Sequence, residues 1–164
     1  MLPLLATLLG SLVLPIAQAA AAPTDWKIAV GWNQTVLPAS AIGTPVGPFT
    51  APSTGSSNVL VSLAASTTSG TPGGTFVCQD TDWGGVCGYA VQPLNECILL
   101  QAPWLKTISS FGPDAGANCF AYASGNCDDG DAQWSFEFPG DDTGGIATTN
   151  PWNDQITSFA CVPS

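Results

Sequence analysis

Histidine is absent from the 164 residues, and only Lys27 and Lys106 carry a positive charge. Without imidazole, the chain has no Ser-His or Cys-His nucleophile and no His-ligated zinc site. Twelve acidic residues against two basic ones give a net charge of −10. Because phosphate recognition needs clustered cations, this balance argues against binding to nucleic acid or to anionic membranes. It favours cations as ligands.

Long apolar runs are absent beyond the first segment of the chain. Residues 4–16 are almost all apolar, and Ala17-Gln18-Ala19 follows with the small-x-small pattern of a cleavage site. A membrane anchor is the alternative, but the run is short for a bilayer and contains a proline. The pattern predicts a signal peptide at residues 1–19, a secreted protein and no membrane span.

Cysteine is absent before residue 78 and then appears six times. An even number of cysteines in a small secreted segment is typical of three disulfides, and the spacings lack the close pairs of a thiolate zinc site. Sequence does not choose among the connectivities that six cysteines allow. Two cysteines recur about forty residues later, and the two without such mates suggest one bridge, Cys97–Cys161. The six are Cys78, Cys87, Cys97, Cys119, Cys127 and Cys161.

Residues 20–75 have a different composition, rich in proline, glycine, serine and threonine and with only two charges. Two interpretations compete: a flexible stalk, or an extension that adds strands at the apolar runs 27–32 and 59–63. The run 59–63 is too apolar for a solvated linker, which favours the second. Residues 38–57, between the two runs, are full of turn formers. Asn33 begins an N-glycosylation sequon, Asn-Gln-Thr.

The cysteine-rich half has few helix-favouring runs, and its aromatic and β-branched residues come in short bursts separated by turn formers. This pattern predicts an all-β fold. The expected strands are 75–80, 86–90, 97–100, 109–112, 118–123, 133–138 and 155–160.

One stretch near the end, Trp152-Asn153-Asp154-Gln155-Ile156-Thr157-Ser158-Phe159, has a degraded copy 48 residues earlier, Trp104-Leu105-Lys106-Thr107-Ile108-Ser109-Ser110-Phe111. Trp, Ile, a hydroxyl, Ser and Phe coincide in register, which indicates a duplicated unit. Acid, amide, hydroxyl and carbonyl oxygens are the ligands that calcium prefers.

Residues 153–158 resemble the calcium motif of βγ-crystallin domains, in which two acid or amide residues, two free positions, Ser or Thr, and Ser follow one another. Cys78, Trp83 and Gly85 have the spacing of the hairpin that opens each unit of that family, with Cys in place of the first aromatic residue. The resemblance covers residues 76–164. It implies two Greek-key motifs in a βγ-crystallin-like sandwich, here stapled by three disulfides. Within the family, the chain most resembles the secreted, cysteine-rich microbial members.

The resemblance also implies one Ca²⁺ site, held between the motif of one unit and the hairpin of the other. The motif would supply the Gln155 carbonyl and the Thr157 hydroxyl, and the hairpin a carboxylate. The alternative is that the motif only caps a turn. The residues implied in the site are Gln155, Thr157, Asp80, Asp82, Asn153 and Asp154.

A second, weaker site would use the first copy of the motif. Leu105 and Lys106 replace its leading acid or amide residues, and an ammonium group repels a divalent cation. An empty, purely structural second site is therefore the favoured interpretation. Its residues would be Thr107, Ser109, Asp128 and Asp129.

These patterns predict a secreted, non-enzymatic protein with weak calcium binding and a role in extracellular stress or in host or competitor interaction. Two alternatives stay open: a killer-toxin-like antimicrobial or effector protein, and a proteinase inhibitor that would use the loop 139–150. The acidic charge argues against a membrane-active toxin. Paired carboxylates can cut glycosides, but nothing in the sequence marks such a pair.

Overall fold

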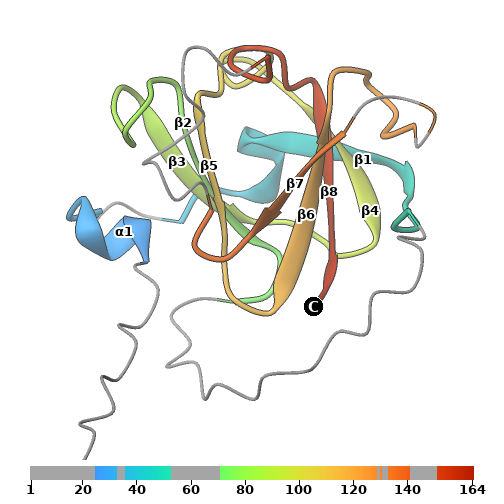
Figure 1. The fold of residues 1–164 in the computed structure, drawn as a ribbon, viewed down its shortest axis with the longest axis horizontal. Coiled ribbons are helices and arrows are strands. Elements are labelled where there is room, and N and C mark those ends of the chain that lie inside the picture. The colour runs from blue at the N-terminus through green and yellow to red at the C-terminus, as the bar shows by residue number, and fades with distance from the viewer. Residues whose placement is uncertain (1–24, 33–35, 53–70, 129, 131–132, 141–150) are drawn as a thin grey trace, which may run out of the picture.

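The computed structural model describes residues 25–32, 36–52, 71–128, 130, 133–140 and 151–164 (Figure 1). The predicted signal peptide, the sequon at Asn33, the apolar run 59–63 and the carboxylate of Asp129 lie outside these residues. Within the described ranges, no helix is long and apolar enough to cross a membrane.

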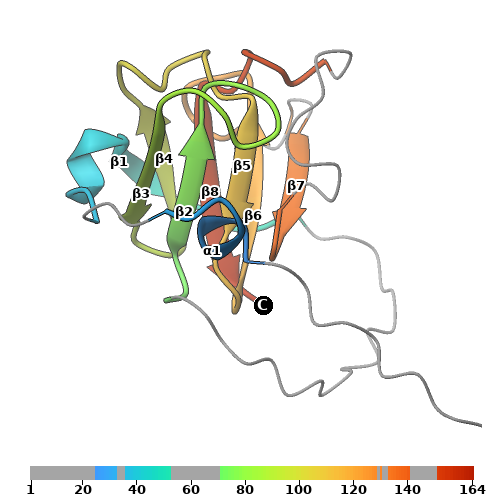
Figure 2. The ribbon, with the colours of Figure 1, turned by 90° about the vertical axis from the view of Figure 1, so that its left-hand side faces the viewer.

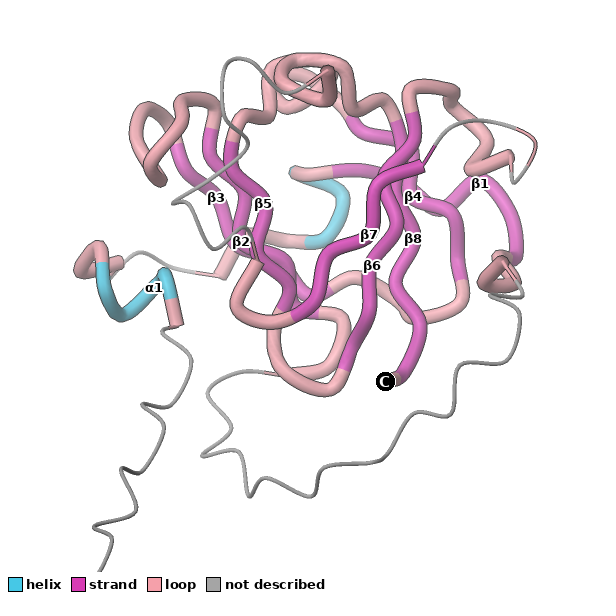
Figure 3. The backbone as a smooth tube through the Cα atoms, in the orientation of Figure 1, coloured by secondary structure: helices cyan, strands magenta, loops and turns pink. Residues whose placement is uncertain are grey.

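Strands dominate the described chain, and the two helices are single turns (Figure 3). All seven predicted strands are present, within three residues at either end, so the all-β prediction is confirmed. The elements are α1 (Trp26–Ala29), η1 (Ala39–Ala41), β1 (Gly43–Pro48), β2 (Gly74–Cys78), β3 (Cys87–Val91), β4 (Glu96–Leu100), β5 (Ser110–Pro113), β6 (Ala117–Tyr122), β7 (Gln133–Glu137) and β8 (Ser158–Pro163).

The strands form two sheets that face one another, with orders β3-β2-β5 and β1-β4-β8-β6-β7. The order β3-β2-β5 in the first unit is repeated as β7-β6-β8 in the second. Strand β4 belongs to the first unit by sequence but pairs with β8 of the second. The first unit thus contributes a strand to the sheet of the second, and the predicted two-key sandwich is confirmed.

The core lies between the two sheets and repeats the duplication seen in the sequence. Ile108 and Ile156 are fully buried, as are Phe111 and Phe159. The members of each pair are 48 residues apart. The main cluster also contains Ile42, Val77, Ile98, Leu100, Trp104 and Phe136.

The three predicted disulfides are present, but the suggested bridge Cys97–Cys161 is wrong. In the ladder between β4 and β8, Cys97 lies opposite Ala160. Successive side chains point to opposite faces of a sheet, so Cys161 faces away from Cys97. Cys161 lies opposite Cys119 on β6 and bonds to it. The bridges are Cys78–Cys87, Cys97–Cys127 and Cys119–Cys161.

The region before residue 75 contributes to the folded body in ways that the sequence pattern did not predict. The run 27–32, expected as a strand, begins with α1, because the Asp25 side chain accepts a hydrogen bond from the Lys27 backbone N–H and caps the helix. Strand β1 lies within the segment that was assigned to turns. It carries Pro45 and Pro48, which are tolerated there because β1 is an edge strand.

Helix α1 lies on the outer face of the sheet β3-β2-β5 (Figure 2). Trp26 stacks on Trp83 with ring centroids 5.4 Å apart, and Trp32 packs edge-on against Phe76 at 5.1 Å. Among the described residues, every backbone hydrogen bond of the segment 25–32 stays within the segment. Side chains therefore hold it to the sheet.

Candidate functional site

The two copies of the motif lie together at one end of the sandwich, between the hairpin after β2 and the loop after β6 (Figure 1). They are joined by two reciprocal backbone hydrogen bonds. Lys106 N–H donates to Ile156 C=O at 3.0 Å, and Asp154 N–H donates to Ile108 C=O at 3.2 Å. Lys106 and Asp154 also share the left-handed conformation, with φ of 56° and 57°. The two stretches are thus related by an approximate two-fold axis.

The last serine of the first stretch fastens the hairpin of its own unit. The Ser110 hydroxyl donates to the Asp80 carbonyl at 2.8 Å and accepts from the Trp83 N–H at 3.2 Å. Ser110 is fully buried. These bonds fix the hairpin on which Asp80 and Asp82 stand.

The second unit repeats this arrangement. The Ser158 hydroxyl donates to the Ser124 carbonyl at 2.8 Å and accepts from the Cys127 N–H at 3.3 Å. Ser158 is fully buried too. Asp80 and Ser124 thus have the same role, as do Trp83 and Cys127, and the duplication is visible in hydrogen bonds as well as in strand order.

The predicted motif ligands Gln155 and Thr157 lie close together. The Thr157 hydroxyl is 3.4 Å from the Gln155 carbonyl oxygen. Two oxygens that each bind a calcium ion at about 2.3–2.6 Å are separated by a similar distance when they are neighbours in the shell. Gln155 is exposed and Thr157 is half-buried, so one side of this oxygen pair is open to solvent.

The two leading residues of the motif add further oxygens. The Asn153 amide N–H donates to the Asp154 carboxylate at 3.1 Å, while the Asn153 amide oxygen is buried and accepts no hydrogen bond. The other Asp154 oxygen accepts from the Ser109 hydroxyl at 3.3 Å. An unpartnered buried oxygen beside a carboxylate is an arrangement that a bound cation would complete.

Asp80 and Asp82, the predicted source of a hairpin carboxylate, are both exposed. The Asp80 carboxylate folds over Gly85, where an added Cβ would come within 2.7 Å of it. Among the described residues, no hydrogen bond joins residues 153–158 to Asp80 or Asp82. Their part in the site stays a prediction.

The residues of the second predicted site are engaged elsewhere. The Thr107 hydroxyl donates to the Pro103 carbonyl at 2.5 Å, and the Asp128 carboxylate accepts from the Gly130 N–H at 2.9 Å. Ser109 contacts Asp154 of the other stretch. Within the described part of the chain, no three His, Cys, Asp or Glu side chains form a group suited to a metal ion. A cation at this end would therefore rely largely on carbonyl, amide and hydroxyl oxygens.

A second polar cluster, which the sequence patterns did not predict, lies on the outer face of the sheet β3-β2-β5, where α1 packs. It joins Asp25 and Lys27 of the N-terminal segment to Tyr89 and Asp114. One signal was present in the sequence: Lys27 is the only cation before residue 106, and it lies between two tryptophans.

No family model matches the chain, and no curated protein matches it either. Solved structures that match include a βγ-crystallin domain from Flavobacterium johnsoniae, 20% identical with a TM-score of 0.42, covering 55% of this chain and 94% of that one. A βγ-crystallin domain from Clostridium beijerinckii is 18% identical with a TM-score of 0.43, covering 56% and 99%. The Ca²⁺-bound βγ-crystallin domain of Abundant Perithecial Protein from Neurospora crassa is 14% identical with a TM-score of 0.41, covering 58% and 94%.

Proposed function

We propose that this chain, whose two-key sandwich is βγ-crystallin-like, is a secreted, non-enzymatic module that binds one Ca²⁺ ion weakly. Its role would lie outside the cell, in stress resistance or in contact with a host or competitor. The ion would be held by the motif 153–158. The observation that carries the proposal is the group of oxygens from Asn153, Asp154, Gln155 and Thr157, one of which is buried without a partner.

The chemistry of this group fits a hard divalent cation. Calcium would take the Asn153 amide oxygen, the Gln155 carbonyl and the Thr157 hydroxyl as neutral oxygen ligands. Asp154, and a carboxylate from Asp80 or Asp82 after a side-chain rotation, would balance the charge. Few charged ligands imply weak binding, with a dissociation constant on the order of 10⁻⁴–10⁻³ M, as in extracellular modules.

Binding of this strength would stabilise the fold only modestly. At a free calcium concentration ten times the dissociation constant, the gain is about 1.4 kcal/mol. The three disulfides, at roughly 2–4 kcal/mol each, contribute more. Calcium would therefore act as a secondary strut in a protein held mainly by its bridges.

Calorimetric titration of the oxidised protein with calcium tests the proposal. We expect Asp154→Ala and Thr157→Ala each to weaken binding at least tenfold, because each removes an oxygen from the group. Glu137→Gln is the matched control: it removes one negative charge from an exposed side chain of β7, outside the motif. Equal heats for the parent and for both motif variants would refute the site.

Secretion is the second part of the proposal. Three disulfides and no free cysteine among the described residues fit an extracellular or otherwise oxidising environment. Protein recovered from culture medium should begin at Ala20, and it should carry a glycan at Asn33 when a glycosylating eukaryotic host makes it. Retention inside the cell with residues 1–19 intact would contradict this part. The effector and inhibitor roles stay alternatives, since most of the loop 139–150 lies outside the described residues.

A further inference from the structure

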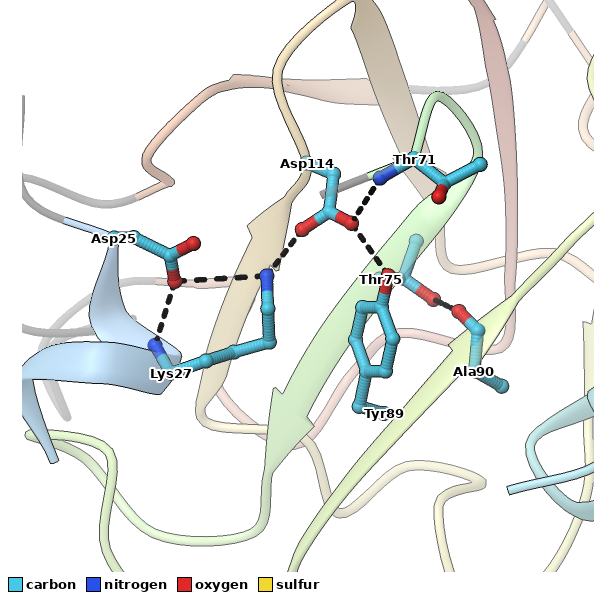
Figure 4. Close-up of polar contacts among 7 residues, drawn as sticks. All are labelled: Asp25, Lys27, Thr71, Thr75, Tyr89, Ala90 and Asp114. Carbon is cyan, nitrogen blue, oxygen red and sulfur yellow. Dashed lines mark hydrogen bonds and ion pairs between the residues drawn. The ribbon is translucent and has the colours of Figure 1, made fainter. Parts of the chain in front are cut away.

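In the cluster that holds the N-terminal segment to the sheet, one largely buried amine contacts two buried carboxylates (Figure 4). The Lys27 ammonium forms an ion pair with Asp114 and lies 3.5 Å from an oxygen of Asp25. The Asp114 side chain has no solvent exposure, that of Asp25 has 6%, and that of Lys27 has 15%. Burial of an ion pair costs several kcal/mol per ion, so the close contact between the two groups has to offset the loss of their hydration.

The two oxygens of Asp114 are in different positions. One faces Lys27, and the other accepts hydrogen bonds from the Tyr89 hydroxyl at 2.5 Å and from the Thr71 N–H at 2.9 Å. The Lys27 nitrogen lies 4.7 Å from the centre of the Tyr89 ring. A side chain at residue 74 would collide with both Asp114 and the Tyr89 hydroxyl, so glycine at this position leaves the space that the cluster fills.

We propose that Lys27 and Asp114 join in a spontaneous isopeptide bond that staples the N-terminal segment to the sandwich. The ammonium first passes one proton to the Asp114 carboxylate, which gives a neutral amine and a carboxylic acid. The amine lone pair then attacks Cγ of Asp114. The bond from Cγ to the oxygen nearer Lys27 breaks, and that oxygen leaves as water. It takes the second proton from the nitrogen through the Asp25 carboxylate.

Each neighbour has a role in this step. Tyr89 and Thr71 donate hydrogen bonds to the oxygen that becomes negative in the tetrahedral intermediate, as in an oxyanion hole. Asp25, held by its bond to the Lys27 N–H at 2.9 Å, relays the proton. Fixed contact between the reacting groups corresponds to effective molarities of about 10⁵–10⁸ M. No oxidant, reductant or co-reactant is needed, and the products are one amide and one water.

The mass of the intact, unreduced protein tests the proposal. We expect it to be lower, by the mass of one water molecule, than the mass of a chain that contains only the three disulfides. Lysine-specific digestion after reduction gives a second readout, because Lys27 and Lys106 are the only cleavage points. An acylated Lys27 resists cleavage, and the fragment starting at residue 107 stays attached to the N-terminal part through Asp114. A denaturing gel should therefore show one band at full size.

Variants separate the bond from a simple salt bridge. Lys27→Met and Asp114→Ala should restore the missing water and release separate fragments on digestion. Asp25→Asn keeps an oxygen to cap α1 but cannot take up the proton, so it should fold and lack the bond. Lys106→Met, at an exposed lysine, should leave the water loss unchanged.

A parent protein at the full mass of the disulfide-bonded chain, with cleavage after Lys27, would overturn the proposal. Loss of water together with cleavage after Lys27 would also overturn it, because that pattern indicates a cyclic imide at an aspartate. A bond that forms completely in Asp25→Asn would overturn the relay assigned to Asp25.

Discussion

At the scale of single residues, the hydroxyls of Ser110 and Ser158 each donate a hydrogen bond to one backbone carbonyl and accept one from one backbone N–H of a hairpin. These backbone groups are not paired in a strand ladder. Both serines are fully buried, so removing either hydroxyl leaves one buried N–H and one partly buried carbonyl without this partner. We expect Ser110→Ala and Ser158→Ala each to lower the free energy of unfolding by about 1–3 kcal/mol in urea titrations.

The matched control for these serines is Ser135→Ala, at an exposed position of β7. It should change the free energy of unfolding by less than about 0.5 kcal/mol. A loss of the same size in all three variants would show that the two buried hydroxyls have no special role.

Tyr89 gives the protein a dependence on alkaline pH. Burial raises the pKa of its hydroxyl above the ordinary value, and the hydrogen bond and charge of Asp114 raise it further. The folded state then keeps a proton that the unfolded chain releases near pH 10, roughly. This contribution to stability is complete below that pH and is lost as the pH rises.

We therefore expect the urea concentration at the midpoint of unfolding to decrease as the pH rises above roughly 10. Tyr89→Phe should make this decrease smaller. The direction is the same if Asp114 carries an amide, because burial is the first cause. Urea titrations at several alkaline pH values measure it. If Tyr89→Phe loses stability with rising pH as steeply as the parent, the alkaline pH dependence does not come from the Tyr89 hydroxyl.

At the scale of elements, β1 extends the larger sheet by pairing with β4, and the two strands are in close contact at Gly43. A Cβ added at Gly43 would lie 2.6 Å from the Leu99 carbonyl oxygen and 2.6 Å from the Ile98 side chain. Gly47 of the same strand has nothing within 4 Å of such an atom. We expect Gly43→Ala to cost about 1–3 kcal/mol, because β1 must move away from β4.

Gly47→Ala is the control within the same strand and should be neutral or slightly stabilising, since it reduces the freedom of the unfolded chain. Chemical denaturation of the two variants measures both effects. If both variants lose a similar free energy of unfolding, the close contact of Gly43 with β4 is not the cause of the loss.

At the scale of the whole molecule, the N-terminal segment completes the fold by covering an aromatic face. Trp26 and Trp32 pack on Trp83 and Phe76, which are 5% and 1% exposed as a result. We expect the double variant Trp26→Ala and Trp32→Ala to lose about 2–4 kcal/mol of stability and to bind a hydrophobic dye at the uncovered sheet.

The control for this face is Ile28→Ala, whose side chain is 70% exposed on the same helix. It should leave both stability and dye binding nearly unchanged. If the double variant behaves like Ile28→Ala, the segment is an appendage and the sandwich is complete without it.

Local signals in the sequence were sufficient for strands β2 to β8, for the presence of three disulfides and for the duplication. Alternating and β-branched bursts mark β2 to β8, and the repeat at a distance of 48 residues marks the pairs Ile108–Ile156 and Phe111–Phe159. These features depend on neighbours along the chain or on a comparison of the chain with itself, so they are readable without coordinates.

Tertiary structure alone decided which distant groups meet. The register of β6 against β8 places Cys119 opposite Cys161. The register of β4 against β8 places Cys97 opposite Ala160, one residue away from Cys161, so the Cys97 side chain points to the other face of the sheet. The contacts of Ser109 with Asp154 and of Lys27 with Asp114 join residues 45 and 87 positions apart. No local pattern encodes such contacts, because the packing of whole sheets sets them. In this protein, those contacts tie the Asp154 carboxylate of the motif to the other stretch and form the buried cluster of the N-terminal segment.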